Sequence, residues 1–386
     1  MSQHQPPRPD HDLNPTGVLH VQSGGSTGAP KQLRRPIQTW VTSAQLEAQA
    51  FGLMAQDRFA VLGSEHHSLW GYVHFRAAQL AAPCVGLSAS DIAAWSASAL
   101  QQWNAVAPTV LYGVPESVAT FARQLHRHAQ SALSVRMLLL GGGPVSPSFP
   151  TSLMQSIFPN ASLWSFYGTA ETSFVGYQRL DLADEGSEHA EDQGRAKGIH
   201  AGQSTQPGSV PSEVPPFVLF TSVELDIRTE ANSSGIGEIW VRSPMTITPQ
   251  SWVNTGDLGR WADGGSFHLL GRATRQLVVK GEKYLVEPIE QALMQRFELA
   301  RVALLANSQG QVSCVIVGRS GEGEAAKPVP ANWVSLEQVN AACRDHDPSF
   351  PGVRRVITLM AKDWPITSAG KTDFVALRGL LEGVNT

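Results

Sequence analysis

The chain has 386 residues, 42% of them hydrophobic, which is enough to bury sizeable cores in two or three domains. Its net charge of −4, with 16% charged residues, leaves no basic footprint and argues against a dedicated nucleic-acid binder. The three cysteines are scattered and lack a histidine at ligand spacing, which supports neither a disulfide framework nor a zinc site. No apolar run reaches membrane-spanning length, and we expect a soluble protein of the cytoplasm.

The first predicted element in chain order is a short strand over residues 17–21, after a polar, Pro-rich stretch at 1–15. That stretch lacks the apolar core of a signal peptide, and we expect a disordered tail. The strand leads into SGGSTGAPK, from Ser23 to Lys31. Glycines let backbone N–H groups converge on anionic oxygens, and a lysine supplies a charge suited to phosphate. A polyphosphate cradle and a flexible Gly/Ser surface loop are the two interpretations of this stretch.

Strands and helices alternate over the next part of the chain. The sequence predicts helices over 42–54, 72–82, 90–104 and 115–130, and buried strands over 59–63, 109–115, 135–140 and 161–166. Strands that alternate with helices of this length indicate a mostly parallel sheet. The predicted fold class is therefore α/β.

The predicted strands are followed by loops at the edge where open α/β sheets bind ligands. Gly142 and Gly143 lie in a triple-glycine run that would let a flat ring approach the backbone. Glu171 follows the strand over 161–166 and could hold Mg²⁺ against phosphates. Ordinary strand-to-helix turns explain each loop singly, whereas three loops together favour one shared site. His67 and Trp70 either line a pocket there or serve the core.

The composition changes at residues 181–216, which are charged and rich in Gly, Ser and Pro, and which predict a flexible surface insertion. Short strands are expected over 217–220, 223–228, 237–242 and 266–270, forming a β-rich subdomain that ends near 272. Within it, Asp257 is expected just after a tight turn. Its carboxylate could accept hydrogen bonds from both hydroxyls of a ribose, or it could cap the turn.

The order of these segments resembles that of the adenylate-forming superfamily, which includes acyl-CoA synthetases, luciferases and peptide-synthetase adenylation domains. The resemblance covers roughly residues 18–378. SGGSTGAPK is similar to the family's phosphate loop, GGGP at 141–144 to its adenine segment and YGTAE at 167–171 to its Tyr-Gly-x-Thr/Ala-Glu motif. TGD at 255–257 is similar to its ribose motif, GRATRQLVVKGEKYLVEPIE at 271–290 to its hinge motif and PITSAGK at 365–371 to its C-terminal lysine loop.

The resemblance also implies which residues form the site. Nucleotide contacts fall on Ser23, Gly24, Ser26, Thr27, Gly28, Lys31, Gly142, Gly143, Tyr167, Gly168, Asp257 and Arg272. Thr169 and Glu171 inherit phosphate and Mg²⁺ contacts, and Lys371 would bridge the substrate carboxylate and the α-phosphate. The acyl pocket is expected to be lined by His67, Trp70, Trp164 and Phe166.

The implied reaction has two steps. A carboxylate attacks the α-phosphate of MgATP, which gives an acyl-adenylate and pyrophosphate, and the acyl group then passes to a thiol. The acceptor would be coenzyme A or a phosphopantetheinylated acyl carrier protein, and the acid an apolar fatty or aryl acid. The implied architecture is an adenylate-forming N-terminal domain at 16–272 and a small mobile α+β domain at 273–386 that carries Lys371. In that domain we expect a helix over 288–297 and paired strands over 302–306 and 312–317.

Two features depart from the family's pattern. The phosphate loop begins at residue 23, so part of the usual acyl-pocket wall is expected to be missing, or supplied by a partner chain or a homodimer contact. The hinge position, commonly Asp or Lys, is Thr274. The alternatives to an active acid–thiol ligase are a ligase that stops at the adenylate and a non-catalytic module that binds nucleotide or acyl-adenylate.

Overall fold

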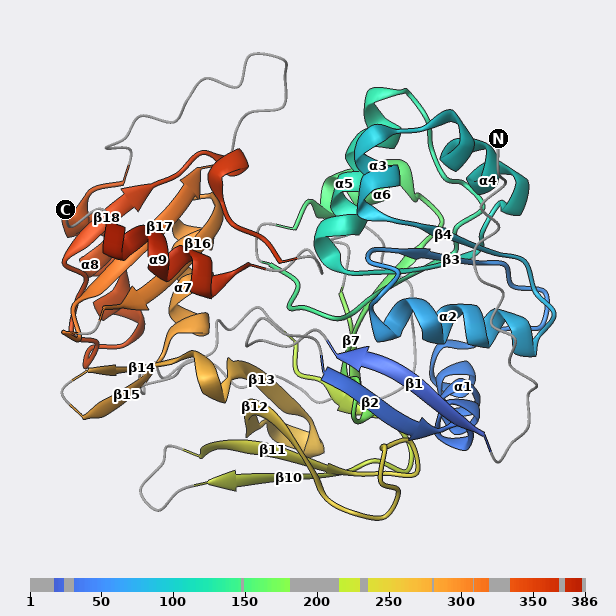
Figure 1. Ribbon diagram of the computed structural model, residues 1–386, viewed down its shortest axis with the longest axis horizontal. Helices are drawn as coiled ribbons and strands as arrows, with labels where there is room; N and C mark the ends of the chain where they lie inside the picture. Colours follow the sequence, from blue (N-terminus) through green and yellow to red (C-terminus); the bar gives the residue numbers. More distant parts are fainter. Residues whose placement is uncertain are drawn as a thin grey trace, which may run out of the picture.

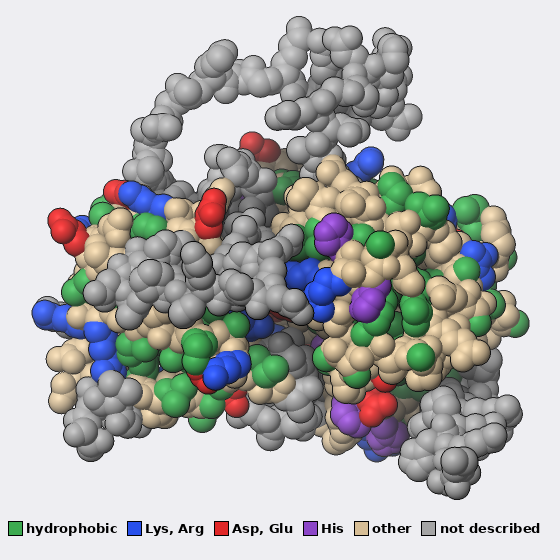
Figure 2. Space-filling view, turned by 90° about the horizontal axis from the view of Figure 1, so that it is seen from above, with side chains coloured by type: hydrophobic (Ala, Val, Ile, Leu, Met, Phe, Trp, Pro, Cys, Tyr) green, Lys and Arg blue, Asp and Glu red, His purple; other side chains and the backbone are tan. Residues whose placement is uncertain are grey.

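The structure is a computed structural model, and it describes residues 17–23, 31–146, 149–180, 215–229, 235–279, 281–307, 309–318, 334–367 and 372–383. The predicted tail at 1–15 and nearly all of the predicted insertion at 181–216 lie outside these residues. No helix in the described part of the chain is long and apolar enough to cross a membrane. On the face shown in Figure 2, the described charged side chains of both signs occur in small groups among uncharged ones.

A seven-stranded sheet forms the centre of the larger body, with strand order β4-β3-β5-β6-β7-β8-β9 (Figure 1). Its strands are β3 (Phe59–Leu62), β4 (Cys84–Leu87), β5 (Val110–Gly113), β6 (Met137–Leu140), β7 (Ser162–Thr169), β8 (Ser173–Arg179) and β9 (Val218–Leu219). The strands from β4 to β7 are parallel, and β8 and β9 are antiparallel additions. Every residue of β3, β5 and β6 is buried, as expected for strands covered on both faces. The predicted α/β class is confirmed.

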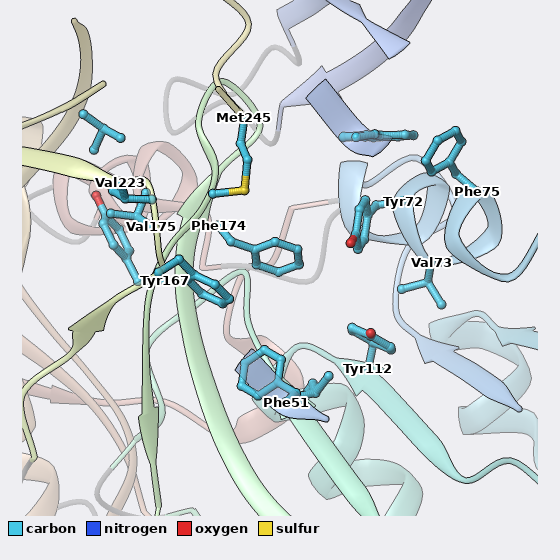
Figure 3. Close-up of a cluster of buried hydrophobic side chains, with 14 of the residues drawn as sticks. Phe51, Tyr72, Val73, Phe75, Tyr112, Tyr167, Phe174, Val175, Val223 and Met245 are labelled. Atoms are coloured by element: carbon cyan, nitrogen blue, oxygen red, sulfur yellow. The ribbon is translucent and has the colours of Figure 1, made fainter. Parts of the chain in front are cut away.

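Helices cover both faces of this sheet (Figure 1). One face carries α1 (Ile37–Phe51) and α2 (Ser68–Gln79), and the other carries α3 (Ala89–Ala94), α4 (Ala97–Val106), α5 (Pro115–Arg127) and α6 (Thr151–Ile157). Because successive strand residues point to opposite faces, Tyr112 packs with α1 and α2, whereas Leu111 packs with α5. Figure 3 shows part of the first of these two cores, which is rich in aromatic rings.

The single helix predicted over 90–104 is wrong, because the chain forms two helices there. The break falls at Trp95, which has a left-handed backbone with φ of 46°. Its indole stacks on His128, with ring centroids 5.1 Å apart. Ser96 then begins α4, because its side chain accepts a hydrogen bond from the Ala99 N–H.

A second, antiparallel sheet has the order β10-β11-β12-β13. Its strands are β10 (Glu224–Thr229), β11 (Ile236–Arg242), β12 (Val253–Trp261) and β13 (Phe267–Arg272), with a 3₁₀ turn η1 (Asp263–Gly265) before β13. Strand β12 was not predicted: Asp257 lies inside it, at a point of irregular register next to Gly256, whose φ is +72°. The predicted strand over 217–220 contributes to the seven-stranded sheet instead, and Phe217 pairs with Phe267 to join the two sheets.

The C-terminal part contains a hairpin and a three-stranded sheet covered by helices. After η2 (Ala273–Arg275), its elements are β14 (Gln276–Val279), β15 (Glu282–Leu285), α7 (Val286–Arg296), β16 (Leu299–Ala306), β17 (Val312–Gly318), α8 (Leu336–His346), β18 (Arg355–Thr358), η3 (Ala361–Asp363) and α9 (Phe374–Gly383). Helices α7 and α8 pack on one face of the β16-β17-β18 sheet, and α9 packs on the other. The predicted helix over 288–297 and the pairing of 302–306 with 312–317 are confirmed.

Candidate functional site

The aspartate of the predicted ribose motif, Asp257, lies in a polar network between the two sheets. Asp257 is the register partner of Arg272 on β13, and Arg272 Nε lies 2.9 Å from Asp257 Oδ1. The Tyr167 hydroxyl, on β7, donates to Asp257 Oδ2 over 2.7 Å. Arg272 Nη1 also donates to the Thr255 carbonyl over 2.9 Å. The structure thus brings together three predicted site residues from β7, β12 and β13.

Burial determines how the charge of Asp257 is compensated and which groups of this network keep their protons. Asp257 is only 5% exposed, so its carboxylate depends on the Arg272 guanidinium for compensation. Burial, together with the nearby Asp257 charge, raises the pKa of Tyr167 well above its ordinary value, and the phenol therefore remains a donor. The irregular part of β12 next to Asp257 is stabilised by Asn254, whose Oδ1 accepts a hydrogen bond from the Gly256 N–H over 2.8 Å.

The turn between β7 and β8 carries two further predicted residues, Thr169 and Glu171. Thr169 Oγ1 accepts hydrogen bonds from the N–H groups of Glu171 and Thr172, each over 3.2 Å. Thr172 Oγ1 in turn accepts from the Thr169 N–H over 3.0 Å. The hairpin is tight at Gly168, where an added Cβ would lie 1.8 Å from the Ser173 carbonyl oxygen. Thr169 therefore stabilises its own turn, and its predicted phosphate contact stays a prediction.

Glu171 has the properties that a magnesium ligand needs. Its carbonyl oxygen is held by the Ile247 N–H over 2.8 Å, so the backbone of the turn is fixed. Within the part of the chain that the structure describes, no hydrogen bond or ion pair occupies its half-buried carboxylate. Mg²⁺ commonly takes only one or two protein carboxylates and fills its other positions with phosphate oxygens and water. A single free carboxylate at this turn fits that pattern, and no described cluster of acidic, His or Cys residues competes with it.

The triple-glycine run after β6 lies beside two predicted pocket residues. The Phe166 ring covers Gly141, where an added Cβ would approach it to 2.1 Å. Gly142 has φ of +79°, and an added Cβ there would lie 3.4 Å from His67 Cε1. At Gly143 an added Cβ would meet no atom of the described residues within 4 Å. The first two glycines therefore allow the Phe166 and His67 side chains to approach the backbone closely. No described side chain covers the third glycine.

His67 has a structural role and also lies at a small hollow, and its predicted contact with a substrate stays a prediction. Its Nδ1 accepts a hydrogen bond from the Leu69 N–H over 3.2 Å and so caps the start of α2. The same ring also lines a small hollow at the carboxyl ends of β3 and β5. The residues around that hollow are Val61, Leu62, Gly63, Ser64, His67, Leu69, Trp70 and Val114.

The two predicted pocket tryptophans lie in different surroundings. Trp70 lines the hollow with His67, stacks on His74 with centroids 5.2 Å apart, and covers Gly86 on β4. Trp164 instead packs edge-on against Phe51, with centroids 5.6 Å apart, on the α1 side of the sheet. The hollow therefore brings together His67 and Trp70, but Trp164 is not among its lining residues.

The predicted phosphate loop connects two paired strands. β1 (Val18–Ser23) and β2 (Lys31–Pro36) are antiparallel, and Ser23 is the register partner of Lys31. The predicted contact residues Gly24, Ser26, Thr27 and Gly28 fall outside the described residues. Lys371 also lies outside them, although the ends of its loop are joined by an antiparallel bridge between Ile366 and Thr372.

Sequence reasoning missed three charged residues near these segments, the first two buried and the third half-buried. They are Arg35 on β2, Glu47 on α1 and Glu287 on α7. Glu287 Oε2 accepts a hydrogen bond from the Arg272 N–H over 2.5 Å, and burial, followed by the nearby Glu290 charge, raises the pKa of Glu287 to about 7. The contacts of these three residues join segments that are distant in the sequence. No local sequence pattern could therefore have indicated them.

The fold and these residues define an α/β protein whose candidate site lies at the carboxyl ends of parallel strands, where such sheets bind ligands. Residues 6–249 match the family described as AMP-binding enzyme. The chain belongs to that family.

Known proteins resemble the chain over most of its length. An uncharacterized acyl-CoA ligase, YhfT, from Bacillus subtilis is 23% identical over 90% of this chain and 65% of its own length. The amide bond synthetase McbA from Marinactinospora thermotolerans superposes with a TM-score of 0.69 at 20% identity, over 99% of this chain and 72% of that one. The O-succinylbenzoate coenzyme A synthetase MenE from Bacillus subtilis, solved with AMP, has a TM-score of 0.65 at 19% identity, over 95% of this chain and 69% of that one. This chain thus spans less than two thirds of the YhfT relative's length.

Proposed function

We propose that this chain activates a carboxylic acid with ATP, giving an acyl-adenylate and pyrophosphate, and then transfers the acyl group to a thiol. The observation that carries the proposal is the Asp257–Arg272–Tyr167 network, because it joins residues of three predicted nucleotide motifs in one cluster, whose aspartate and tyrosine are buried. Asp257 would accept hydrogen bonds from the ribose hydroxyls. Membership of the AMP-binding family supports the same function.

Positioning and charge neutralisation would supply most of the rate, because a carboxylate is already a nucleophile and needs no general base. Glu171, together with phosphate oxygens, would hold Mg²⁺, which when bound neutralises charge on the triphosphate. Gly143, which has open space above it, would admit the flat adenine ring. Lys371 would approach both the carboxylate and the α-phosphate and offset their repulsion.

The second step would require the part of the chain after residue 272 to move. We propose the domain division at 272/273, with η2 as the hinge, because the C-terminal cores contain only residues beyond it. Rotation there would withdraw the Lys371 loop and admit the thiol of coenzyme A or of a carrier-protein phosphopantetheine.

The proposed substrate class is supported only by the character of the residues around the small hollow next to His67, which has room for about one water molecule in this structure. Its lining is mainly apolar, with the His67 ring at one side and the Trp70 indole at another. Such a lining favours an apolar fatty acid or an aryl acid over a highly charged one.

Pyrophosphate release over a panel of fatty and aryl acids tests the proposal. We expect release that depends on acid, ATP and Mg²⁺, and thioester formation with coenzyme A or a phosphopantetheinylated carrier protein. Lys371→Ala should slow adenylation by about 10²-fold, by analogy with the loss of other electrostatic donors. Hydroxylamine trapping without thioester formation would identify an enzyme that stops at the adenylate. ATP binding without acid-dependent pyrophosphate release would instead identify a non-catalytic binding module.

A further inference from the structure

Arg35 is a fully buried charged residue that the proposed mechanism does not use. It lies on β2, the strand that follows the phosphate loop, opposite Leu19 on β1. It is 1% exposed, although an arginine on a two-stranded hairpin would be expected to extend into water. Its side chain must therefore be held by partners from elsewhere in the chain.

Those partners lie on the turn that carries Glu171 and on a loop beside it. Arg35 Nη2 donates to the Glu171 carbonyl over 3.3 Å and to the Met245 carbonyl over 3.1 Å. Its Nη1 donates to Ser173 Oγ. The Glu171 carbonyl also accepts the Ile247 N–H over 2.8 Å, so the turn is held from two sides. One guanidinium thus joins the phosphate-loop hairpin, the Glu171 turn and the loop after β11.

This arrangement is costly, since no carboxylate among the described residues forms an ion pair with the guanidinium. Burial lowers the pKa of Arg35 to about 10, and the nearby Glu171 charge offsets part of that effect, so the side chain is still cationic at neutral pH. Its buried Nε has no hydrogen-bond partner in the part of the chain that the structure describes. A simple structural link would be made more cheaply by an uncharged side chain, because a buried charge without a close counter-charge is destabilising.

We propose that Arg35 is a positioning residue that holds the Glu171 turn, and with it the Glu171 carboxylate, against the β1–β2 hairpin. This inference rests on the proposed function, in which Glu171 holds Mg²⁺ against the triphosphate. The planar guanidinium donates in fixed directions to the Glu171 carbonyl and Ser173 Oγ, which a lysine ammonium cannot reproduce. The acyl pocket at His67 and Trp70 lies outside this set of contacts.

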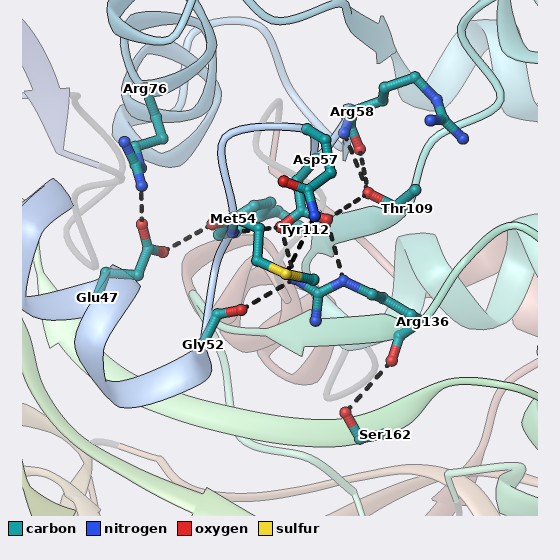
Figure 4. Close-up of polar contacts among 11 residues, drawn as sticks. Glu47, Gly52, Met54, Asp57, Arg58, Arg76, Thr109, Tyr112, Arg136 and Ser162 are labelled. Carbon is teal, nitrogen blue, oxygen red and sulfur yellow. Dashed lines mark hydrogen bonds and ion pairs between the residues drawn. The ribbon is translucent and has the colours of Figure 1, made fainter.

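The test compares Arg35→Lys and Arg35→Met with Arg136→Lys. Arg136 is a matched control, because it also forms multiple hydrogen bonds, to Asp57 and the Gly52 carbonyl (Figure 4). It precedes β6, and so lies at the opposite ends of the parallel strands from the candidate site. The Lys variant keeps the charge and removes the fork, whereas the Met variant removes both. Melting temperatures establish that each variant folds.

Two of the measurements do not require the protein to be catalytically active. Amide hydrogen exchange over residues 165–180 should speed up in Arg35→Lys and stay unchanged in Arg136→Lys. Calorimetry with ATP at varied Mg²⁺ should show MgATP affinity lower by about tenfold or more in Arg35→Lys, as expected when charge-assisted hydrogen bonds that fix a ligand are lost. In the pyrophosphate assay, KM for MgATP should rise while KM for the acid stays constant.

The results separate this inference from the proposed function. If the natural protein binds MgATP but releases no pyrophosphate, the proposed function fails, and the exchange and calorimetry measurements still decide the role of Arg35. Equal exchange and equal MgATP affinity in Arg35→Lys and the natural protein would overturn the inference. So would a rise in both KM values together, or a natural protein that binds no MgATP.

Discussion

Glu47 provides a sharp test of how burial controls charge in this protein. This carboxyl group on α1 is completely buried and accepts hydrogen bonds from the hydroxyls of Tyr72, over 2.7 Å, and Tyr112, over 2.8 Å. The guanidinium of Arg76 lies 3.8 Å from Glu47 Oε2, too far for a hydrogen bond (Figure 4). Burial therefore outweighs the favourable contacts and raises the pKa of Glu47 from 4.5 to about 7.

The sign and size of the effect on stability follow from that pKa. Because the folded state holds the Glu47 proton more tightly than the unfolded state, this proton stabilises the fold fully below pH 4.5. The contribution is lost as pH rises through about 7. A shift of this size corresponds to about 3 kcal/mol, most of which falls between pH 5 and pH 8. Glu47→Gln removes the titrating group while keeping a similar shape.

The assay is urea unfolding followed by tryptophan fluorescence, with Trp40 close to the cluster because its ring lies 5.6 Å from that of Tyr72. Between pH 5 and pH 8 the natural protein should lose about 2–3 kcal/mol more unfolding free energy than Glu47→Gln. Other titrating groups are common to both proteins, so their effects cancel in this difference. Identical pH dependence in the two proteins would refute the reasoning.

Three further predictions concern backbone and junction contacts. Gly168→Ala should lower the free energy of unfolding by about 2 kcal/mol or more, because its methyl would meet a backbone carbonyl, while Gly143→Ala should change little; thermal melting compares the two. Asp57→Asn should cost about 2 kcal/mol in chemical denaturation, and less as pH falls, because several contacts together hold the pKa of Asp57 below its ordinary value. Burial raises that pKa, but the hydrogen bonds from Arg136, the Met54 N–H and Thr109, with the Arg136 charge, lower it by more in sum. Glu287→Ala should expose the segment after Arg272 to limited proteolysis, whereas Glu287→Gln, which keeps an acceptor oxygen, should protect it.

Much of the fold could be predicted because its strands are locally distinctive. The β3, β5 and β6 segments are short apolar runs that alternate with helical patterns, and all their residues are buried. Strand β12 was missed because its TGD segment resembles a turn in sequence when the neighbouring strands are unknown. The glycine of that segment does have a positive φ, but it lies within the strand. The break at Trp95 was missed because a bulky residue rarely adopts a left-handed backbone, and here tertiary packing on His128 accompanies it.

The candidate site was predictable only to the extent that its residues lie in local motifs. Tyr167, Asp257 and Arg272 could each be selected from a short segment, and the β12–β13 register then places the last two side by side. Arg35 and Glu47 could not be selected in the same way. Their burial depends on partners as far as 210 and 65 positions away in the chain, and nothing in the adjacent residues carries that information.

Arg272 connects the Asp257 network to the C-terminal part of the chain. Its side chain is bound to Asp257 and the Thr255 carbonyl, within a sheet that the Phe217–Phe267 pairing joins to the main body. Its N–H is bound to Glu287, on the first helix of the C-terminal part. A rotation about η2 would therefore have to break the Glu287 contact while the Asp257 contact persisted. The pKa of Glu287 is raised to about 7, mainly by burial. The rotation should therefore be easier at higher pH, because the ionised carboxylate then favours exposure to water.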